Sequence, residues 1–311
     1  LFLIKILKYN PDLLYVPHFN IPILYPKKIV TAIPDLIMHS FSTQAGTTLP
    51  KPYFLFKKMI YKLVVLIAVL RTYKNICPSQ DVKKDFERHY PFVNKNKFVV
   101  SYEGIDKDLL IKPSKEFIKD TLKKYNIDSN FLLYVSSMYE HKNLKRLIDS
   151  FKVLINKYKF KGNLVIIGKN DNFSKKIQQY IKDIKLDQQI LMPGMKNFVT
   201  DNEVNAFRSS ALLYVFPSLK EGFSLTPLEA QYFNLPCVIS NIACHKEIYG
   251  DSVYYFDPYS IDDIAKNIDY VINNTNIQKD LIEKGTQNVK RYSWEKTAKD
   301  TLKVFEDALN S

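Results

Sequence analysis

Residues 131–168, FLLYVSSMYEHKNLKRLIDSFKVLINKYKFKGNLVIIG, contain the pattern that decides the fold. The runs 131–135 and 164–167 are short, apolar and bounded by polar residues, which is typical of buried strands. Between them one apolar face recurs at helical spacing, made of Leu144, Leu147, Ile148, Phe151, Leu154 and Ile155. A strand, a helix and a second strand in this order predict a βαβ unit with parallel strands.

The same alternation continues toward the C-terminus. Further strands are expected at 190–192, 212–216, 236–239 and 253–256, and helices around 177–184 and 203–210. Three consecutive helices are expected at 259–273, 277–292 and 293–309. This pattern predicts an α/β fold with a doubly wound parallel sheet.

Before residue 112 the pattern is weaker, with strand candidates at 12–16, 28–33, 75–77 and 98–101. A charged stretch around Pro113 reads as a linker leading into a short helix. We therefore expect two Rossmann-like domains, 1–112 and 113–292, and a terminal helix, 293–311, that packs back toward the first domain. A complete Rossmann-like half usually has more strands and a glycine-rich loop, so the first domain is expected to be incomplete at its N-terminus.

Composition narrows the classes of function. The net charge of +13 attracts phosphate groups. The lysines are dispersed along the chain, however, so a solvated surface rich in lysine explains the charge equally well. Among eight glycines there is no G-x-G-x-x-G pattern, which argues against a dinucleotide oxidoreductase. No aromatic-basic motif indicates a nucleic-acid partner.

The cysteines and apolar runs indicate a cytoplasmic protein. Three scattered cysteines do not make a disulfide framework. Cys237, Cys244 and His245 are not accompanied by a second pair of ligands at the spacing of a zinc finger. No metal site is therefore expected. The apolar run 63–70 is shorter than the roughly 20 residues of a bilayer-spanning helix, and residues 1–7 do not read as a signal peptide.

The segment 221–229, EGFSLTPLE, follows one of the expected strands. Open α/β sheets bind ligands beyond the carboxyl ends of their strands. Gly222 lets the backbone approach a ligand closely, and the amides of residues 223–225 lie just before a helix N-terminus, which favours phosphate. A structural alternative exists, because 226–229 reads as a capping box with Pro227 at the first helical position. Glu229 would then only cap the helix, whereas Glu221 is not explained by capping.

Residues 221–230, EGFSLTPLEA, resemble the E-G-F-G-L-x-x-L-E-A segment of the GT-B glycosyltransferases of family four, also called glycosyl transferases group one, with mannosyltransferases among them. The resemblance implies that Glu221 contacts hydroxyls of a donor sugar and that Glu229 holds the ribose. It further implies donor binding by Gly222, Phe223, Ser224 and Leu225, whose amides approach the diphosphate. Ser224 stands where the family commonly has glycine.

Residues 134–144, YVSSMYEHKNL, are similar to the family's Y-V-G-x-x-x-x-x-K-N-L segment. The resemblance implies that Lys142 neutralises charge on the departing diphosphate, although a solvated lysine at a helix start is the plain alternative. Ser136 and Ser137 replace a glycine and an arginine of many relatives, and we count Ser137 among the donor-binding residues. His141 replaces a frequent second basic residue.

The first half resembles the family's acceptor-side strands more loosely, through 12–18 and 31–36. His18 and Asp35 are the acceptor-side candidates, with Pro34 where relatives often carry histidine. The family's first strand and glycine-rich loop, normally upstream of residue 1, are absent from this sequence.

The resemblance implies a retaining sugar transfer from a nucleotide-diphosphate sugar to the hydroxyl of a glycan or lipid-linked acceptor, in surface polysaccharide or glycolipid synthesis. No metal or other cofactor is expected. The basic charge suits peripheral contact with the inner membrane face. Two alternatives remain: a nucleotide-sugar binding protein without turnover, and a GT-B sugar-nucleotide epimerase.

Overall fold

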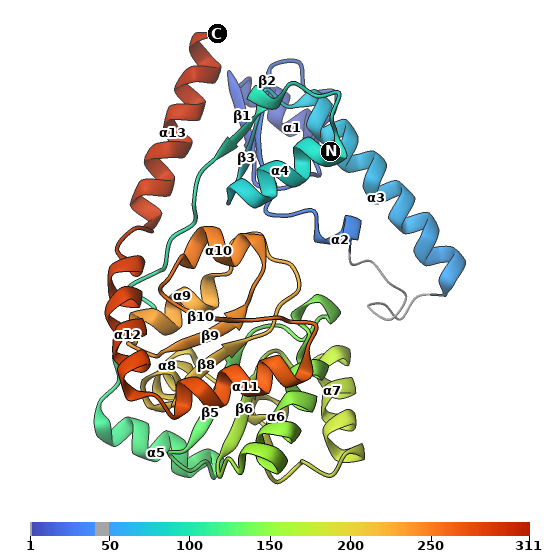
Figure 1. The fold of residues 1–311 in the computed structure, drawn as a ribbon. Helices are drawn as coiled ribbons and strands as arrows, with labels where there is room; N and C mark the ends of the chain where they lie inside the picture. Colours follow the sequence, from blue (N-terminus) through green and yellow to red (C-terminus); the bar gives the residue numbers. More distant parts are fainter. Residues whose placement is uncertain (1, 41–49) are drawn as a thin grey trace. The chain divides into compact units, whose positions relative to one another are not determined.

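The computed structural model describes residues 2–40 and 50–311 (Figure 1). The chain divides into two compact units. The first comprises Leu1–Gly104, Glu221–Phe223 and Ser293–Ser311, and the second Ile105–Lys220 and Ser224–Tyr292. The units divide after Gly104, whereas the sequence analysis placed the boundary at residue 112.

The first unit contains a four-stranded parallel sheet with the order β1-β2-β3-β4. Its strands are β1 (Leu13–Val16), β2 (Lys28–Ala32), β3 (Lys74–Cys77) and β4 (Phe98–Val100). Its helices are α1 (Phe2–Tyr9), α2 (Ile37–Ser40), α3 (Lys51–Arg71), α4 (Gln80–His89), the 3₁₀ turn η2 (Lys95–Lys97) and α13 (Trp294–Asn310). All four strands expected from the sequence are confirmed.

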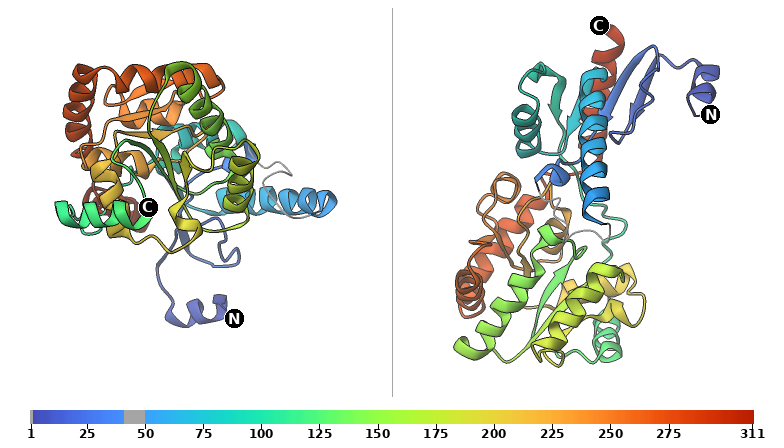
Figure 2. Two further views of the ribbon diagram at one scale, coloured as in Figure 1. Left: turned by 90° about the horizontal axis from the view of Figure 1, so that it is seen from below. Right: turned by 90° about the vertical axis from the view of Figure 1, so that its right-hand side faces the viewer.

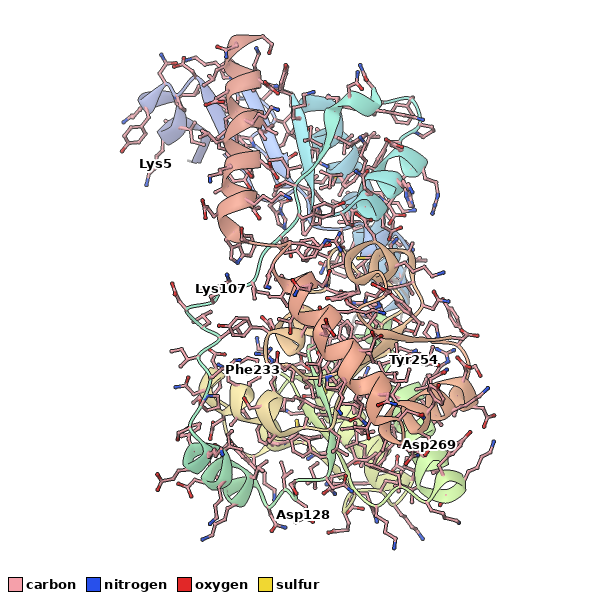
Figure 3. The ribbon with its side chains drawn as sticks, turned by 60° about the vertical axis from the view of Figure 1, so that its left-hand side comes forward. Lys5, Lys107, Asp128, Phe233, Tyr254 and Asp269 are labelled. Atoms are coloured by element: carbon pink, nitrogen blue, oxygen red, sulfur yellow. The ribbon has the colours of Figure 1, made fainter. Side chains whose placement is uncertain are left out.

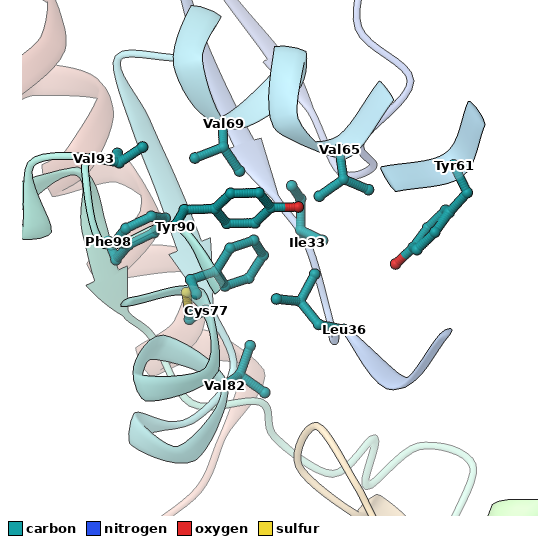
Figure 4. Packing of buried hydrophobic residues seen from close by; sticks show 11 residues of the cluster. Ile33, Leu36, Tyr61, Val65, Val69, Cys77, Val82, Tyr90, Val93 and Phe98 are labelled. Atoms are coloured by element: carbon teal, nitrogen blue, oxygen red, sulfur yellow. The ribbon is translucent and has the colours of Figure 1, made fainter. Parts of the chain in front are cut away.

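Alternation along β3 sends neighbouring side chains into two separate cores. Cys77 joins a cluster with Val69 of α3 and Phe86 of α4 on one face of the sheet (Figure 4). Ile76 packs on the other face against Val304 of α13. The small sheet is therefore covered on both faces by helices from distant parts of the sequence.

The second unit contains a six-stranded parallel sheet with the order β10-β9-β8-β5-β6-β7. Its strands are β5 (Phe131–Val135), β6 (Asn163–Ile167), β7 (Ile190–Leu191), β8 (Leu213–Phe216), β9 (Cys237–Ser240) and β10 (Tyr254–Phe256). The expected doubly wound sheet is confirmed. Its chain order reverses between β5 and β8, where Leu132 pairs with Leu213.

Helices lie on both faces of this sheet (Figure 2). They are α5 (Lys115–Tyr125), α6 (Leu144–Tyr158), α7 (Asn172–Asp183), α8 (Asp201–Ser210), α9 (Leu225–Tyr232), α10 (Ala243–Tyr249), α11 (Ile261–Ile272) and α12 (Thr275–Val289), with 3₁₀ turns η3 (Glu140–Lys142) and η4 (Pro193–Met195). Asp128 lies in the short connection from α5 to β5 (Figure 3). The charged stretch around Pro113 thus leads into a helix, as expected.

Two local features differ from the sequence analysis. Helix α9 begins at Leu225 with Ser224 as its N-cap, so the capping box expected at 226–229 is wrong and Pro227 lies inside the first turn. Helix α3 extends through 51–71, where the sequence analysis noted only an apolar run at 63–70. Within 2–40 and 50–311, none of the helices combines the length and hydropathy that a bilayer-spanning segment requires.

Candidate functional site

The candidate site lies at the carboxyl ends of β5 and β8, where the strand order of the second unit reverses. Loops leaving neighbouring parallel strands diverge at such a point and leave a crevice for a ligand. The turn after β5 contains Ser137 and Lys142, and the chain after β8 leads to Ser224 and the start of α9. Both sequence motifs therefore end at one edge of the sheet.

The side chain of Asn143 joins these turns. Its amide nitrogen donates to the carbonyl oxygens of Pro217, 3.1 Å away, and of Pro258, 2.8 Å away. Asn143 is buried and adopts a left-handed conformation with φ 60°, which asparagine tolerates better than most residues. The amide of Leu219 also donates to the carbonyl oxygen of His141, at 2.7 Å. The turn after β5 is thus fixed against the chain that follows β8.

Lys142 supplies positive charge at this edge. Its ammonium lies 5.2 Å from the centroid of the Phe216 ring, a cation–π distance that holds it over the end of β8. Burial, with the charge of Lys142 as a second cause, lowers the pKa of His141 to about 4. Burial also lowers the pKa of His245 to about 3, and Lys142 contributes there too. Both imidazoles are therefore neutral at pH 7.

Ser224 occupies the N-cap position of α9. Its φ is 75°, and its side chain makes no capping hydrogen bond. Its hydroxyl oxygen lies 2.9 Å from Nε2 of His245, whose Nδ1 lies 2.8 Å from the carbonyl oxygen of Ser240. A carbonyl only accepts, so Nδ1 carries the proton and Nε2 accepts from the Ser224 hydroxyl. The Ser224 hydroxyl therefore does not satisfy the first amides of α9, and a helix N-terminus of this kind favours an anion.

Glu229, on α9, forms an ion pair with Arg208 of α8. Nη1 of Arg208 also donates to Oδ1 of Asn205, at 3.1 Å, so the guanidinium is held from two sides. Burial raises the pKa of the Glu229 carboxyl, Arg208 opposes that rise, and Asp201 adds to it. Arg208 was not identified from the sequence, because no local motif relates it to a glutamate 21 residues later.

The other predicted donor residues have the following positions. Glu221 and Phe223 are buried at 6% and 2% exposure, and with the half-buried Gly222 they form the part of the sequence between β8 and α9 that is assigned to the first unit. Leu225 is the first residue of α9. Ser137 is half-buried, and its carbonyl oxygen accepts from the Tyr134 hydroxyl at 2.7 Å.

The predicted acceptor residues lie in the first unit. His18 follows β1 and Asp35 follows β2, so both lie beyond the carboxyl ends of two paired strands. His18 is exposed, and its Nδ1 accepts from the amide of Asn20 at 3.0 Å. Oδ1 of Asp35 accepts from the amide of Ile37 at 2.8 Å. The structure thus places these two residues at one edge of the smaller sheet, and the Lys142 and Glu229 side chains at one edge of the larger.

Replacing Asn143 tests how far the site depends on its amide. We expect Asn143→Ala to lower the free energy of unfolding by about 2–4 kcal/mol, since two buried hydrogen bonds are lost and alanine is strained at positive φ. Asn143→Gly loses the same hydrogen bonds, but glycine adopts positive φ without strain, so this variant should lower the free energy of unfolding less. Urea unfolding measures both, with the exposed Asn156→Ala on α6 as control. Equal effects of the alanine and glycine variants would contradict the role of the left-handed conformation.

Sequence comparison identifies a family and relatives of this chain. The model of the family "Glycosyl transferases group 1" matches residues 115–288, more than half of the chain. The O-antigen chain mannosyltransferase RfbU of Salmonella typhimurium is 26% identical over 240 residues, covering 77% of this chain and 61% of that protein. The chain thus spans about three fifths of that relative's length.

Solved structures resemble both units. A glycosyltransferase from Rickettsia africae matches with a TM-score of 0.76 at 20% identity, over 99% of this chain and 79% of that one. Anabaena HepE, solved in complex with UDP and glucose, matches with a TM-score of 0.76 at 16% identity, over 99% of this chain and 81% of that one. These likenesses establish the two Rossmann-like units as a GT-B fold, and with the family match over 115–288 they show that the chain belongs to the glycosyl transferases group 1 family.

Proposed function

We propose that this chain is the catalytic part of a retaining hexosyltransferase that uses a nucleotide-diphosphate sugar. The observation that carries the proposal is the edge of the second sheet where Lys142 and the uncapped start of α9 occur together. A cation beside helix amides that the N-cap side chain does not satisfy is a site that favours a diphosphate. Family membership and the mannosyltransferase relative support a hexosyl donor and a role in surface polysaccharide synthesis.

In this proposal the diphosphate lies against the first amides of α9, with Lys142 beside it. The bond between the anomeric carbon and the diphosphate oxygen breaks, and negative charge builds on that oxygen. The Lys142 ammonium stabilises this charge, while the neutral His141 and His245 add none. A preformed positive charge at the leaving group accelerates its departure without a metal.

The remaining donor contacts come from the two glutamates. Glu229 would accept hydrogen bonds from the ribose hydroxyls, because Arg208 holds its carboxylate in place. Glu221 would accept from hydroxyls of the sugar. Gly222, Phe223 and Ser137 complete the proposed donor site, where their backbone groups would contact the donor.

Retention follows if the acceptor attacks the face that the diphosphate leaves. The acceptor oxygen then bonds to the anomeric carbon, and its proton moves to the departing diphosphate oxygen, so no protein general base is required. We propose His18 and Asp35 as groups that orient the acceptor. Determining the anomeric configuration of the product by NMR tests this step, since inversion would exclude it.

The products of the reaction distinguish a glycosyltransferase from a binding protein and from an epimerase. Glu221→Ala should abolish most transfer while nucleotide binding persists. Wild-type protein that binds the donor without turnover would favour a binding protein, and conversion of the donor sugar without an acceptor product would favour an epimerase. Equal transfer by wild type and Glu221→Ala would remove Glu221 from the mechanism.

Removing the Lys142 charge should lower kcat by about 10²–10³-fold, the size of effect typical for losing one transition-state donor. Lys142→Arg keeps the charge and should recover part of this loss. Steady-state transfer from the donor measures kcat, with the exposed Lys145→Ala on α6 as the matched control. A variant that changes KM alone would assign Lys142 to donor binding and not to the chemical step.

The raised pKa of Glu229 predicts pH-dependent nucleotide binding. A raised pKa means that the carboxylate takes up its proton at a higher pH than an ordinary glutamate and then loses acceptor capacity. On acidification, affinity for UDP or GDP should therefore begin to fall at a higher pH than an ordinary glutamate would give, while His141, with a pKa of about 4, is still neutral. Glu229→Gln should bind about tenfold more weakly at pH 7. The same pH profile in Glu229→Gln would show that the titration belongs to another group.

We also propose that the acceptor is lipid-linked and that α3 contacts the membrane carrying it. Large apolar side chains on α3 are exposed, among them Tyr53, Phe56, Met59 and Leu63. Lys57 and Lys62 are exposed between them, a combination that favours the surface of an anionic bilayer.

Co-sedimentation with phosphatidylglycerol vesicles tests this contact. Phe56→Ser with Met59→Ser should weaken binding at least several-fold, since each loses buried apolar area. Phe198→Ser is the matched control, because Phe198 is 85% exposed on the second unit. No preference of the wild type for anionic over neutral vesicles would contradict the proposal.

A further inference from the structure

The first unit contains a cavity of about 960 Å³ at the amino edge of its sheet. Lys28 and Lys74, which line it, are the first residues of β2 and β3, and Lys97 directly precedes β4. His18 and Asp35 follow the carboxyl ends of β1 and β2. The cavity therefore lies at the edge of this sheet opposite the proposed acceptor residues, and none of the proposed donor residues lines it.

The lining is strongly basic. The cationic lining residues are Lys27, Lys28, Arg71, Lys74 and Lys97. Among the described residues that line the cavity, Asp12 is the single acidic one, and it pairs with Lys27 at 2.9 Å. Four positive charges, those of Lys28, Arg71, Lys74 and Lys97, thus line one space of ligand size, and the carboxylate of Asp12 pairs with the fifth cation, Lys27. Pockets of this volume hold small organic ligands.

Backbone carbonyl groups fix these cations in place without neutralising them. Nζ of Lys28 donates to the carbonyl oxygen of Ala308, that of Lys74 to Asn96, and that of Lys97 to Val69 and Leu70, at 2.7–3.0 Å. Arg71 donates to three carbonyl oxygens of the loop before β2. An ammonium has three protons, so donors remain on each lysine for an anion.

Helix capping explains only part of this arrangement. Lys97 and Lys28 contact the last carbonyls of α3 and α13, where cations are favourable. Lys74 caps neither helix. Its ammonium lies 5.7 Å from the centroid of the Tyr73 ring, and that of Lys28 lies 5.1 Å from the same centroid, so one aromatic ring orients both cations.

Mutual repulsion in the cavity supports an anionic occupant. Burial lowers the pKa of Lys97, and the positive charge of Arg71 lowers it further. A multiply charged anion between these side chains would remove the repulsion and use the remaining donors.

We propose that this cavity is a second ligand site, which binds a phosphate-bearing polyanion of the diphosphate type. Its volume of about 960 Å³ and its four cations not paired with a carboxylate exceed the needs of a single phosphate. Such a diphosphate occurs either as a soluble ion or as the headgroup of a lipid that carries a glycan, and both present the same oxygens to the lysines.

Inorganic pyrophosphate is the probe, titrated by calorimetry into Lys142→Ala protein so that the proposed donor site contributes less. Lys74→Gln in this background should weaken pyrophosphate binding about tenfold, as expected for one charge-assisted hydrogen bond. Lys84→Gln removes the same charge from an exposed position of α4 outside the cavity and should change affinity less than twofold. Equal affinity of the Lys74→Gln and Lys84→Gln variants would overturn the proposal.

A second cavity variant shows whether weaker binding results from misfolding. Lys27→Gln alters the cavity wall without touching the carbonyl contacts of α3 or α13, and it should also weaken pyrophosphate several-fold while the melting temperature stays near that of the control. If Lys142→Ala abolishes pyrophosphate binding and neither Lys74→Gln nor Lys27→Gln changes it, all pyrophosphate binds at the donor site. That result would contradict the second site.

Vesicles distinguish the two sources of the diphosphate. Neutral vesicles doped with a polyprenyl diphosphate should bind wild-type protein more tightly than Lys74→Gln if the ligand is a lipid headgroup. If pyrophosphate binding depends on Lys74 but vesicle binding does not, the ligand is the soluble anion. Either result supports the site, and independence of both from Lys74 and Lys27 overturns it.

Discussion

The site of the second unit depends on one buried amide. Asn143 donates to two proline carbonyls, one after β8 and one after β10, and so connects three loops at the carboxyl edge of the sheet. Parallel strands bring loops to one edge but do not fix their conformation. Without that amide, the turn that contains Lys142 would have fewer bonds to the chain that leads to α9. The turn after β5 and the chain after β8 are therefore held together by the hydrogen bonds of Asn143.

Much of the fold follows from periodicity, and the parts that do not have physical reasons. The strand Phe131–Val135 and the helix behind it were predicted because their apolar residues repeat with the correct periods. The start of α9 was misplaced, because residues 226–229 fit the pattern of a capping box. In the structure the helix already begins at Leu225, after Ser224 in a left-handed conformation. Helix α3 escaped notice because apolar residues occur on its exposed side as well, which obscures a single face.

The candidate site was predictable only where chemistry is local in sequence. Lys142 and Glu229 lie in motifs whose residues are neighbours along the chain, and the structure brings their loops to one sheet edge. Arg208 is on a separate helix and meets Glu229 only through packing, so no pattern reveals it. The basic cavity of the first unit is of the same kind, since its lysines come from the starts of different strands.

The bond between Ser224 and His245 has a consequence for how this segment can vary. A serine at φ 75° is strained where glycine would not be, and the imidazole holds its hydroxyl in the one direction that leaves the helix amides open. A related chain with glycine at this position would have no hydroxyl to hold, and the histidine imidazole would keep only its hydrogen bonds with Ser240. The two positions should therefore change as a pair during divergence, so that the residue found at one restricts which residues the other can accept.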